Sequence, residues 1–343
     1  MAYLRNCWYV AALSKEVQAS KIFTRKILDE NILFFRDQTG LATAMADRCP
    51  HRFAQLSMGK LQDDCIQCPY HGLTFNQQGQ CVHNPHGDGR IPDKAKVKVF
   101  PVVERYSAIW IWMGEPALAN PKTIPSCDFL DSENFYIGSD YMNIQGNYLL
   151  ESDNILDLSH IEFVHPLFSS PSVSAGEYKC EVEGNTIWSK RDIYNDSQAP
   201  EFIHKVFRIP QGTVIDRWLH VHWQAPAIMA LYSGGVASGK NRSEGVETPG
   251  FHWFTPETET SSHYFFGISF PKAMGEEFEK IAAEEIKQLR APFEFEDKPI
   301  IESQQRNIGN KDFWDERPLI LNIDAAGTKA RRIMQKMIDE ENA

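Results

Sequence analysis

Two short segments of this 343-residue chain each pair one thiol with one imidazole. They are Cys49-Pro50-His51 and Cys68-Pro69-Tyr70-His71, and 16 residues separate them. Two thiolates and two imidazoles can hold a [2Fe–2S] cluster in which the cysteines bind one iron and the histidines bind the other. Because neutral imidazole replaces thiolate charge, such a cluster accepts an electron more readily than a four-cysteine cluster. The segments therefore predict an electron-transfer centre, known as a Rieske centre.

Two other interpretations fit the same residues less well. A Cys2His2 zinc site usually groups like ligands together, whereas each segment here mixes cysteine with histidine. Cys65 and Cys68 form a C-x-x-C of the redox-dithiol type, but that motif opens a helix. The residues after Cys68 favour a turn and then a strand. Gly72, directly after His71, would let the backbone approach the cluster sulfurs closely.

Residues 154–166 carry candidate ligands for a second metal. Asn154, Asp157 and His160 follow one another at i, i+3 and would share one flank of a helix. His165 would lie about 140° further round a regular helix, so it can join His160 at one ion only if the helix ends. Pro166 favours that end, because the residue before a proline is pushed out of the helical region.

A mononuclear iron site that activates O₂ needs two histidines and one carboxylate on one face of the ion. Asp297 is the preferred carboxylate and Glu296 is its rival, both just before a helix start that Pro299 marks. Either acid could instead serve the helix dipole, and the two histidines could be hydrogen-bonded core residues. The neighbouring electron-transfer centre favours the iron site, because an electron donor needs an acceptor.

Composition limits the partners and the compartment. With 46 acidic and 35 basic residues the net charge is −11, which argues against a nucleic-acid partner. The odd number of cysteines, seven, argues against a disulfide framework and for a reducing compartment. A signal-peptide layout and a membrane-length apolar run are both lacking in the sequence. We therefore expect a cytoplasmic protein with no membrane and no nucleic-acid partner.

The elements that must position these ligands fall into two predicted domains. Residues 1–116 are expected to form an all-β Rieske domain, because short β-branched and aromatic runs alternate with turn signals. Residues 117–343 are expected to form an α+β catalytic domain in which helices flank an antiparallel sheet of the helix-grip type. Helices are expected over 148–164, 275–291 and 325–340. Strands are expected near 179–193, 203–209, 218–223, 227–232, 251–254 and 262–270, and the glycine-rich stretch 233–249 is expected to be a mobile loop over the site.

The chain resembles the oxygenase components of Rieske non-haem iron monooxygenases, in particular the aromatic demethylases that include vanillate and dicamba O-demethylase. The resemblance covers nearly the whole length and includes both cluster segments, residues 5–11, 101–105, 154–165, 255–258 and 263–266, and Glu296-Asp297 with Glu302. It implies that His160, His165 and Asp297 bind a mononuclear Fe(II) and that Asn154 lies beside it. It also implies a homotrimer, in which Asp157 links His160 to a cluster histidine of the next subunit.

The resemblance further implies the reaction and the partners. A separate NAD(P)H-dependent reductase, with or without a ferredoxin, would supply electrons, since the chain has neither a ferredoxin-type cysteine set nor a dinucleotide fingerprint. O₂ and a small aromatic substrate would then react, most simply by oxidative O-demethylation. N-demethylation and methyl or ring hydroxylation of another small hydrophobic substrate are the alternatives within the family.

His252 matches a substrate-binding histidine of the dicamba relative, although a hydrogen-bonded strand histidine is an equal interpretation. The relative's polar contact near residues 228–232 has no counterpart here, so a carboxylate substrate bound in the same way is not expected. Two other functions stay open. A stand-alone Rieske electron carrier would not need Asp157, His160, His165 and Asp297 together, and a zinc-dependent hydrolase would not need the cluster.

Overall fold

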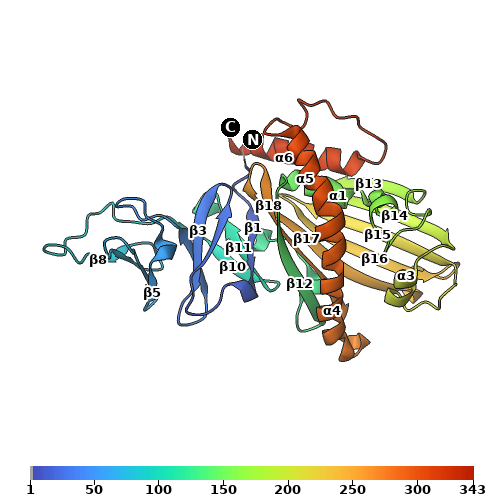
Figure 1. Cartoon of the computed structure of the whole chain (residues 1–343), viewed down its shortest axis with the longest axis horizontal. Coiled ribbons are helices and arrows are strands. Elements are labelled where there is room, and N and C mark those ends of the chain that lie inside the picture. The colour runs from blue at the N-terminus through green and yellow to red at the C-terminus, as the bar shows by residue number, and fades with distance from the viewer. Residues whose placement is uncertain (1–2) are drawn as a thin grey trace. The chain divides into compact units, whose positions relative to one another are not determined.

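The structure, a computed structural model, describes residues 3–343, which form two compact units (Figure 1). One unit is Arg5–Ile124, and the other is Pro125–Ala343 together with the described residues before Arg5. The division after Ile124 lies beyond the expected boundary at residue 116, and the 3₁₀ turns Pro116–Leu118 and Pro121–Thr123 lie between these two points. None of the helices in the described chain is both long and apolar enough to span a membrane.

The first unit is built from three small antiparallel sheets with strand orders β1-β11-β10, β2-β3-β4-β9 and β5-β6-β7-β8. Their strands are β1 Trp8–Leu13, β2 Phe23–Ile27, β3 Glu30–Arg36, β4 Ala42–Ala46, β5 Lys60–Gln62, β6 Cys65–Gln67, β7 Thr74–Phe75, β8 Cys81–His83, β9 Val99–Phe100, β10 Val102–Arg105 and β11 Ala108–Trp112. The apolar run over 97–103 is divided between two sheets, with β9 in one and β10 in the other. Pro101 separates β9 from β10, since proline cannot donate to a ladder of backbone hydrogen bonds.

The second unit is organised around one seven-stranded antiparallel sheet with the order β12-β18-β17-β16-β15-β14-β13. The strands are β12 Phe135–Ile144, β13 Glu177–Glu183, β14 Thr186–Asp196, β15 Ile215–Gln224, β16 Ile228–Ala237, β17 Val246–Thr258 and β18 Ser261–Pro271. Large aromatic side chains such as Trp223, Trp253 and Phe265 are fully buried on these strands. Their burial gives the sheet the apolar surface that its helices cover.

The helices of this unit are α1 Tyr148–Leu156, α2 Ile161–Val164, α3 Glu201–Val206, α4 Glu277–Pro292, α5 Lys298–Ile308 and α6 Ala325–Glu341. Helix α4 packs against β12 and β18, and α6 packs against α1 and β14 (Figure 1). The buried residues of α4 include Phe278, Ala282 and Ile286, whose spacing of four residues predicted this helix correctly. The expected helix-flanked antiparallel sheet is therefore present.

Two sequence expectations are wrong in this unit. The strand expected at 203–209 is helix α3, which begins after Pro200 and buries Ile203 and Phe207, four residues apart. The loop expected at 233–249 is largely the hairpin of β16 and β17. Gly234 serves packing rather than mobility, because a Cβ there would lie 2.1 Å from the Trp218 ring, whereas Gly239, between the two strands, has φ of +84° and open space around it.

Candidate metal centres and substrate cavity

The two cluster segments are tight turns between strands. The first follows β4, and the second connects β6 to β7. The N–H of Phe53 donates to the carbonyl of Cys49 at 2.9 Å, and the N–H of Gly72 donates to the carbonyl of Cys68 at 3.1 Å. Gly72 has φ of +72°, and a Cβ there would also meet Cγ of Pro85 at 3.1 Å. Glycine therefore permits the second turn to close.

These turns bring the four predicted cluster ligands together. Cys49 and Cys68 are buried, and burial, with the Cys68 thiol beside it, raises the pKa of Cys49 to about 11. The rings of His51 and His71 have centroids 4.6 Å apart. Nδ1 of His71 is buried without a hydrogen-bond partner among residues 3–343, and a bond to a metal would satisfy it. The donor set and the unsatisfied nitrogen fit a Rieske cluster.

A second group of ligand atoms assembles within the other unit. One atom each of His160, His165 and Asp297 lies within 4.8 Å of the others. Nε2 of His165 is 3.2 Å from Oδ2 of Asp297, and Nε2 of His160 is 3.5 Å from Oδ1. His165 and Asp297 are only 3% and 5% exposed, so water has little access to these atoms. Two imidazoles and one carboxylate form the donor set of a mononuclear Fe(II) site.

Neighbouring groups hold both imidazoles in orientation. Nδ1 of His160 is 2.6 Å from the carbonyl oxygen of Asp157, and Nδ1 of His165 is 2.6 Å from Oε2 of Glu296. A carbonyl or carboxylate oxygen only accepts, so each Nδ1 carries the proton and each Nε2 presents its lone pair to the site. Burial lowers the pKa of His160. Burial also opposes the charged form of His165, but the Asp297 and Glu296 carboxylates outweigh it and raise the pKa of His165.

Glu296 contributes to the site in a way that was not predicted from the sequence. Glu296 was considered only as an alternative to Asp297, whereas both acids contact His165. Consecutive residues on a helix point about 100° apart, so two adjacent acids can approach one imidazole from different sides. The available signal was the adjacency of the two acids itself.

Irregular backbone brings His160, His165 and Asp297 together. The helix expected over 148–164 breaks at Asp157, which has φ of −121° and ψ of 93° and is followed by the 3₁₀ turn Leu158–His160. A second break comes at His165, before Pro166, as expected. On the opposite side the π-helical turn Phe293–Asp297 joins α4 to α5, so Asp297 does not lie at a free helix start. Such π turns are rare and occur frequently at functional sites.

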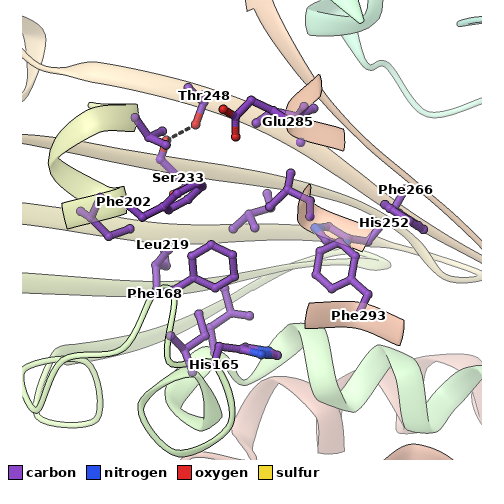
Figure 2. A pocket seen from close by; sticks show the side chains of 18 of the residues that line it. His165, Phe168, Phe202, Leu219, Ser233, Thr248, His252, Phe266, Glu285 and Phe293 are labelled. Carbon is purple, nitrogen blue, oxygen red and sulfur yellow. Dashed lines mark hydrogen bonds between the residues drawn. The ribbon is translucent and has the colours of Figure 1, made fainter. Parts of the chain in front are cut away.

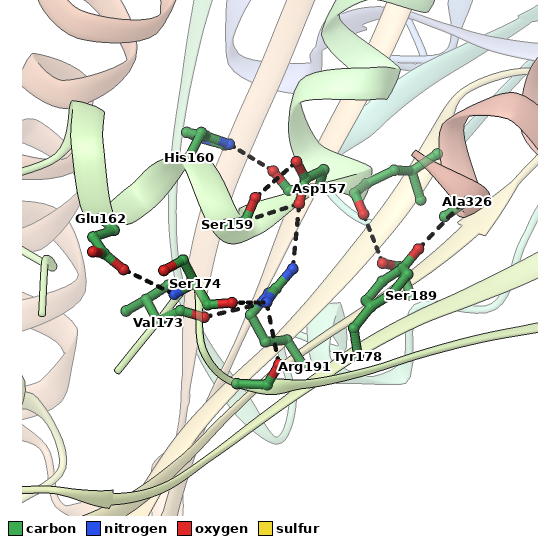
Figure 3. Close-up of polar contacts among 12 residues, drawn as sticks. Asp157, Ser159, His160, Glu162, Val173, Ser174, Tyr178, Ser189, Arg191 and Ala326 are labelled. Carbon is green, nitrogen blue, oxygen red and sulfur yellow. Dashed lines mark hydrogen bonds and ion pairs between the residues drawn. The ribbon is translucent and has the colours of Figure 1, made fainter. Parts of the chain in front are cut away.

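Asn154 and Asp157 both lie beside the iron ligands, and Figure 3 shows the contacts of Asp157. Nδ2 of Asn154 donates to Oδ1 of Asp297 at 3.1 Å. The backbone carbonyl oxygen of Asp157, rather than its carboxylate, contacts Nδ1 of His160. The carboxylate instead accepts hydrogen bonds from Ser159 and faces Nη2 of Arg191 at 3.4 Å. Capping the next turn requires this orientation.

A cavity of about 150 Å³ adjoins the candidate iron ligands (Figure 2). His160, His165 and Asp297 all contribute to its wall. Most of the remaining wall is apolar, and it comes from β15, β16, β18, α3, α4, the π turn and the chain after α2 and α3: Phe168, Phe202, Ile203, Val206, Phe207, Leu219, Leu231, Phe266, Ile268, Phe270, Ile286, Leu289 and Phe293. Such a wall suits a flat apolar ligand with few polar contacts.

His252, the candidate substrate residue, lines this cavity from β17. Its Nδ1 lies 2.6 Å from the hydroxyl of Tyr264, and burial lowers the pKa of His252 to about 4. The imidazole is therefore neutral near pH 7. Features of both interpretations are present, since the side chain is hydrogen-bonded within the sheet and also borders the cavity. The neighbouring strand β16 presents apolar Leu231 to the same space.

Comparison with known proteins assigns both units. The family model described as Rieske [2Fe-2S] domain matches residues 7–101, and the one described as vanillate O-demethylase oxygenase C-terminal domain matches residues 144–340. The chloroacetanilide N-alkylformylase oxygenase component of Rhizorhabdus wittichii (strain DC-6 / KACC 16600) is 37% identical over 99% of this chain and 97% of its own. The dicamba O-demethylase oxygenase component of Stenotrophomonas maltophilia is 35% identical over 100% of both chains.

A solved structure agrees with this assignment. The crystal structure of dicamba monooxygenase bound to 3,6-dichlorosalicylic acid has a TM-score of 0.91 and 34% identity, and each chain covers 100% of the other. The predicted fold class, the two cofactors and the family resemblance are thereby confirmed. The chain belongs to the Rieske non-haem iron oxygenases of the vanillate O-demethylase type, monooxygenases with a [2Fe–2S] cluster and a mononuclear iron that work as components of multicomponent systems.

Proposed function

We propose that this chain oxidatively O-demethylates a small aromatic substrate. One observation carries the proposal: a two-histidine, one-carboxylate site borders an apolar cavity in a chain that also has a Rieske domain. One oxygen atom of O₂ is inserted into a methoxy C–H bond, and the hemiacetal breaks into a phenol and formaldehyde. The other oxygen atom becomes water, with two electrons and two protons that derive from NAD(P)H and solvent.

In this proposal the chain's residues have separate roles. Cys49, His51, Cys68 and His71 hold the cluster, and His160, His165 and Asp297 hold Fe(II), which supplies O₂ activation and C–H oxidation when it is bound. Asp157 and Glu296 fix the proton on each Nδ1. The apolar wall excludes water and orients the ring of the substrate. Neutral His252 stands as a hydrogen-bonding partner for the substrate.

We further propose a homotrimer in which Asp157 lies between His160 and a cluster histidine, His71, of the next subunit. The Asp157 side chain is 20% exposed, which leaves its carboxylate accessible to another chain. Exposed aromatic side chains flank both centres: Phe53 and Tyr70 beside the cluster, Phe163 and Phe295 beside the iron ligands. Apolar surface of this kind supports an interface between copies.

Residues 1–116 form the cluster domain in this proposal, and residues 117–343 form the catalytic domain. A separate reductase, or a reductase with a ferredoxin, reduces the cluster. The protein works in the reducing cytoplasm, which is supported by seven cysteines without a disulfide in the described chain.

Metal analysis of anaerobically purified protein tests the proposal. About three iron atoms per chain are expected, two for the cluster and one for the mononuclear site. Two irons alone would indicate an electron carrier, and zinc without iron would indicate a hydrolase. A panel of methoxy-aromatic compounds with a surrogate reductase should then give formaldehyde in step with NADH use.

N-dealkylation is the second candidate reaction. The relative named chloroacetanilide N-alkylformylase is 37% identical to this chain, slightly more than the dicamba O-demethylase at 35%. The same assay separates the two reactions, because O-demethylation leaves a phenol and N-dealkylation leaves an N–H group. Screening N-alkyl anilides beside methoxy-aromatic compounds decides between them.

A further inference from the structure

His252 is held by a residue that does not itself border the cavity. Its Nδ1 lies 2.6 Å from the hydroxyl oxygen of Tyr264, and both side chains are buried. His252 of β17 pairs in register with Phe266 of β18, and Tyr264 lies two residues before Phe266 on the same face. Phe266 and His252 line the cavity, whereas Tyr264 lies beyond its wall. Tyr264 can therefore act on a bound substrate only through His252.

The surroundings of the Tyr264 hydroxyl offer it one acceptor. The ring of Tyr264 packs among aromatic side chains, since the ring centroids of Phe254, Phe266 and Phe293 lie 4.7, 4.9 and 5.7 Å from its own. Within residues 3–343, Nδ1 of His252 is the only hydrogen-bond partner of this hydroxyl. Burial raises the pKa of Tyr264, so the hydroxyl keeps its proton at neutral pH. That proton needs an acceptor, and His252 supplies it.

This hydrogen bond fixes the tautomer of His252. Burial lowers the pKa of His252 to about 4, so near pH 7 the neutral ring carries one proton, on either Nδ1 or Nε2. A proton on Nδ1 would leave the buried Tyr264 hydroxyl without an acceptor, which disfavours that tautomer about tenfold or more. Tyr264 therefore donates to Nδ1, and Nε2 carries the ring proton. The part of the chain that the structure describes has no acceptor for this Nε2–H group, and His252 borders the cavity (Figure 2).

A ring fixed in this way offers the cavity a donor and no acceptor. Without the Tyr264 hydroxyl, the neutral ring could present either an N–H group or a lone pair on Nε2. A site that is built to hydrogen-bond one kind of group rejects a ligand that lacks it, because the buried polar group of the site is then left unpaired. The tautomer of His252 therefore decides which ligands this otherwise largely apolar cavity accepts.

We propose that Tyr264 is a positioning residue that holds His252 as a hydrogen-bond donor, so that the cavity selects aromatic substrates that carry an oxygen acceptor. The inference rests on the proposed function, because it takes this cavity as the place where the substrate binds. A neutral carbonyl and an anionic carboxylate share the chemistry that Nε2–H recognises, and binding measurements separate these two sources.

Matched probes test this selection in the wild-type protein. Methoxyacetophenone and isopropenylanisole differ only in a carbonyl oxygen against a methylene group, methoxyaniline carries an N–H donor, and methoxybenzoate carries an anionic acceptor. The ortho, meta and para isomers of each probe cover different positions of the acceptor on the ring. In equilibrium dialysis with anaerobic holoenzyme, at least one isomer of the ketone or the benzoate should bind about tenfold or more tightly than the matching isopropenyl compound.

Three results in these measurements overturn the proposal. They are equal affinity for every acceptor probe and its apolar analogue, a preference for the aniline, and failure of every acceptor isomer to bind at millimolar concentration. A preference for the ketone assigns a neutral acceptor to the substrate, and a preference for the benzoate assigns an anionic one.

Variants separate the role of Tyr264 from general effects on the fold. Tyr264→Phe keeps the packed ring and should reduce the preference for the acceptor probe to about threefold or less. A purely structural role would weaken all probes equally and leave that preference unchanged. Tyr141→Phe is the matched control, since the Tyr141 hydroxyl lies 2.9 Å from Nδ1 of His263 and neither residue lines the cavity. A wild-type preference in Tyr264→Phe, or an equal loss in both variants, would contradict the proposal.

Turnover of the same probes keeps this inference distinct from the proposed function. If binding follows Tyr264 as expected but no probe yields formaldehyde, O-demethylation fails and the role of Tyr264 stands. If formaldehyde forms but the preference is independent of Tyr264, the role of Tyr264 fails and O-demethylation stands. For probes that react, Tyr264→Phe should act mainly on KM and leave the visible and EPR spectra of the cluster unchanged, because the cluster ligands belong to the other compact unit.

Discussion

The two metal sites differ in how far their ligands are spread along the chain. The cluster site takes its four candidate ligands from residues 49–71, in two turns between short strands. The iron site takes two from residues 160–165 and one from residue 297, and strands β13–β18 lie between them in sequence. The first site can be recognised from a local motif, whereas the second exists only after the whole catalytic unit has folded.

The sites also differ in exposure, and this matches what each must do. His51 is exposed and His71 is half-buried, so the cluster lies where an electron partner can approach. His165 and Asp297 are buried beside an apolar cavity, where water would compete with substrate for the iron. An electron can tunnel across a surface contact, but a C–H bond must be held next to the oxidant. One chain therefore separates a surface redox group from an enclosed reaction site.

The largest effect is expected from removal of one ligand of the enclosed iron site. His160→Ala should abolish turnover and leave the Rieske EPR signal intact, because the cluster ligands belong to the other compact unit. Cys49→Ser is the reciprocal variant and should remove the Rieske spectrum. Product formation by His160→Ala at wild-type iron content would contradict the ligand assignment.

The next effect concerns the link between the two sites. Asp157→Asn keeps the size of the side chain and one acceptor for the Ser159 cap, but it removes the charge that faces Arg191. Both metals should stay loaded, because His160 contacts the backbone carbonyl rather than this carboxylate. Oxidation of the reduced cluster in single turnover should slow by orders of magnitude. Ser159→Ala, which loses only a capping hydroxyl, is the control and should transfer electrons at the wild-type rate.

The same contrast explains which features the sequence predicted. Spacing within the cluster turns and the position of Pro166 were readable, because both depend on neighbouring residues. Whether Asp297 or Glu296 faces the site depends on the π turn, and the sequence had no local signal for that turn. The prediction of a loop over residues 233–249 was wrong at Gly234, because glycine serves both turns and close packing and only the Trp218 ring shows which use applies there.

A moderate effect is expected at Glu296, which supports His165 without being a proposed ligand. Glu296→Gln keeps a side chain of equal size but replaces a charged acceptor that lies 2.6 Å from Nδ1. The affinity for the mononuclear iron should fall about 10–100-fold, as is usual for loss of such a partner. Iron retention against a chelator measures this. Glu294→Gln on the same π turn is the control, because Glu294 pairs with Arg290 and not with a histidine.

The smallest effect is expected for a partly exposed ion pair of the Rieske unit. Both oxygens of Glu104 accept hydrogen bonds from Arg36 at 2.7 Å, and this contact lowers the pKa of Glu104. Glu104→Gln should cost about 0.5–1 kcal/mol of unfolding free energy at pH 7, because solvent screens the pair. A depressed carboxyl pKa stabilises the fold above the unfolded value of 4.5 and loses that contribution as pH falls toward the folded value. The difference between wild type and variant should therefore shrink below pH 4.5 in urea titrations that follow the cluster absorption.

The buried Arg217–Asp196 pair of the catalytic unit provides the contrast, since Asp196→Asn leaves a buried guanidinium without its counter-charge and should cost about 3–5 kcal/mol. Equal costs for the two variants would contradict the view that burial makes the Arg217–Asp196 pair the more important of the two.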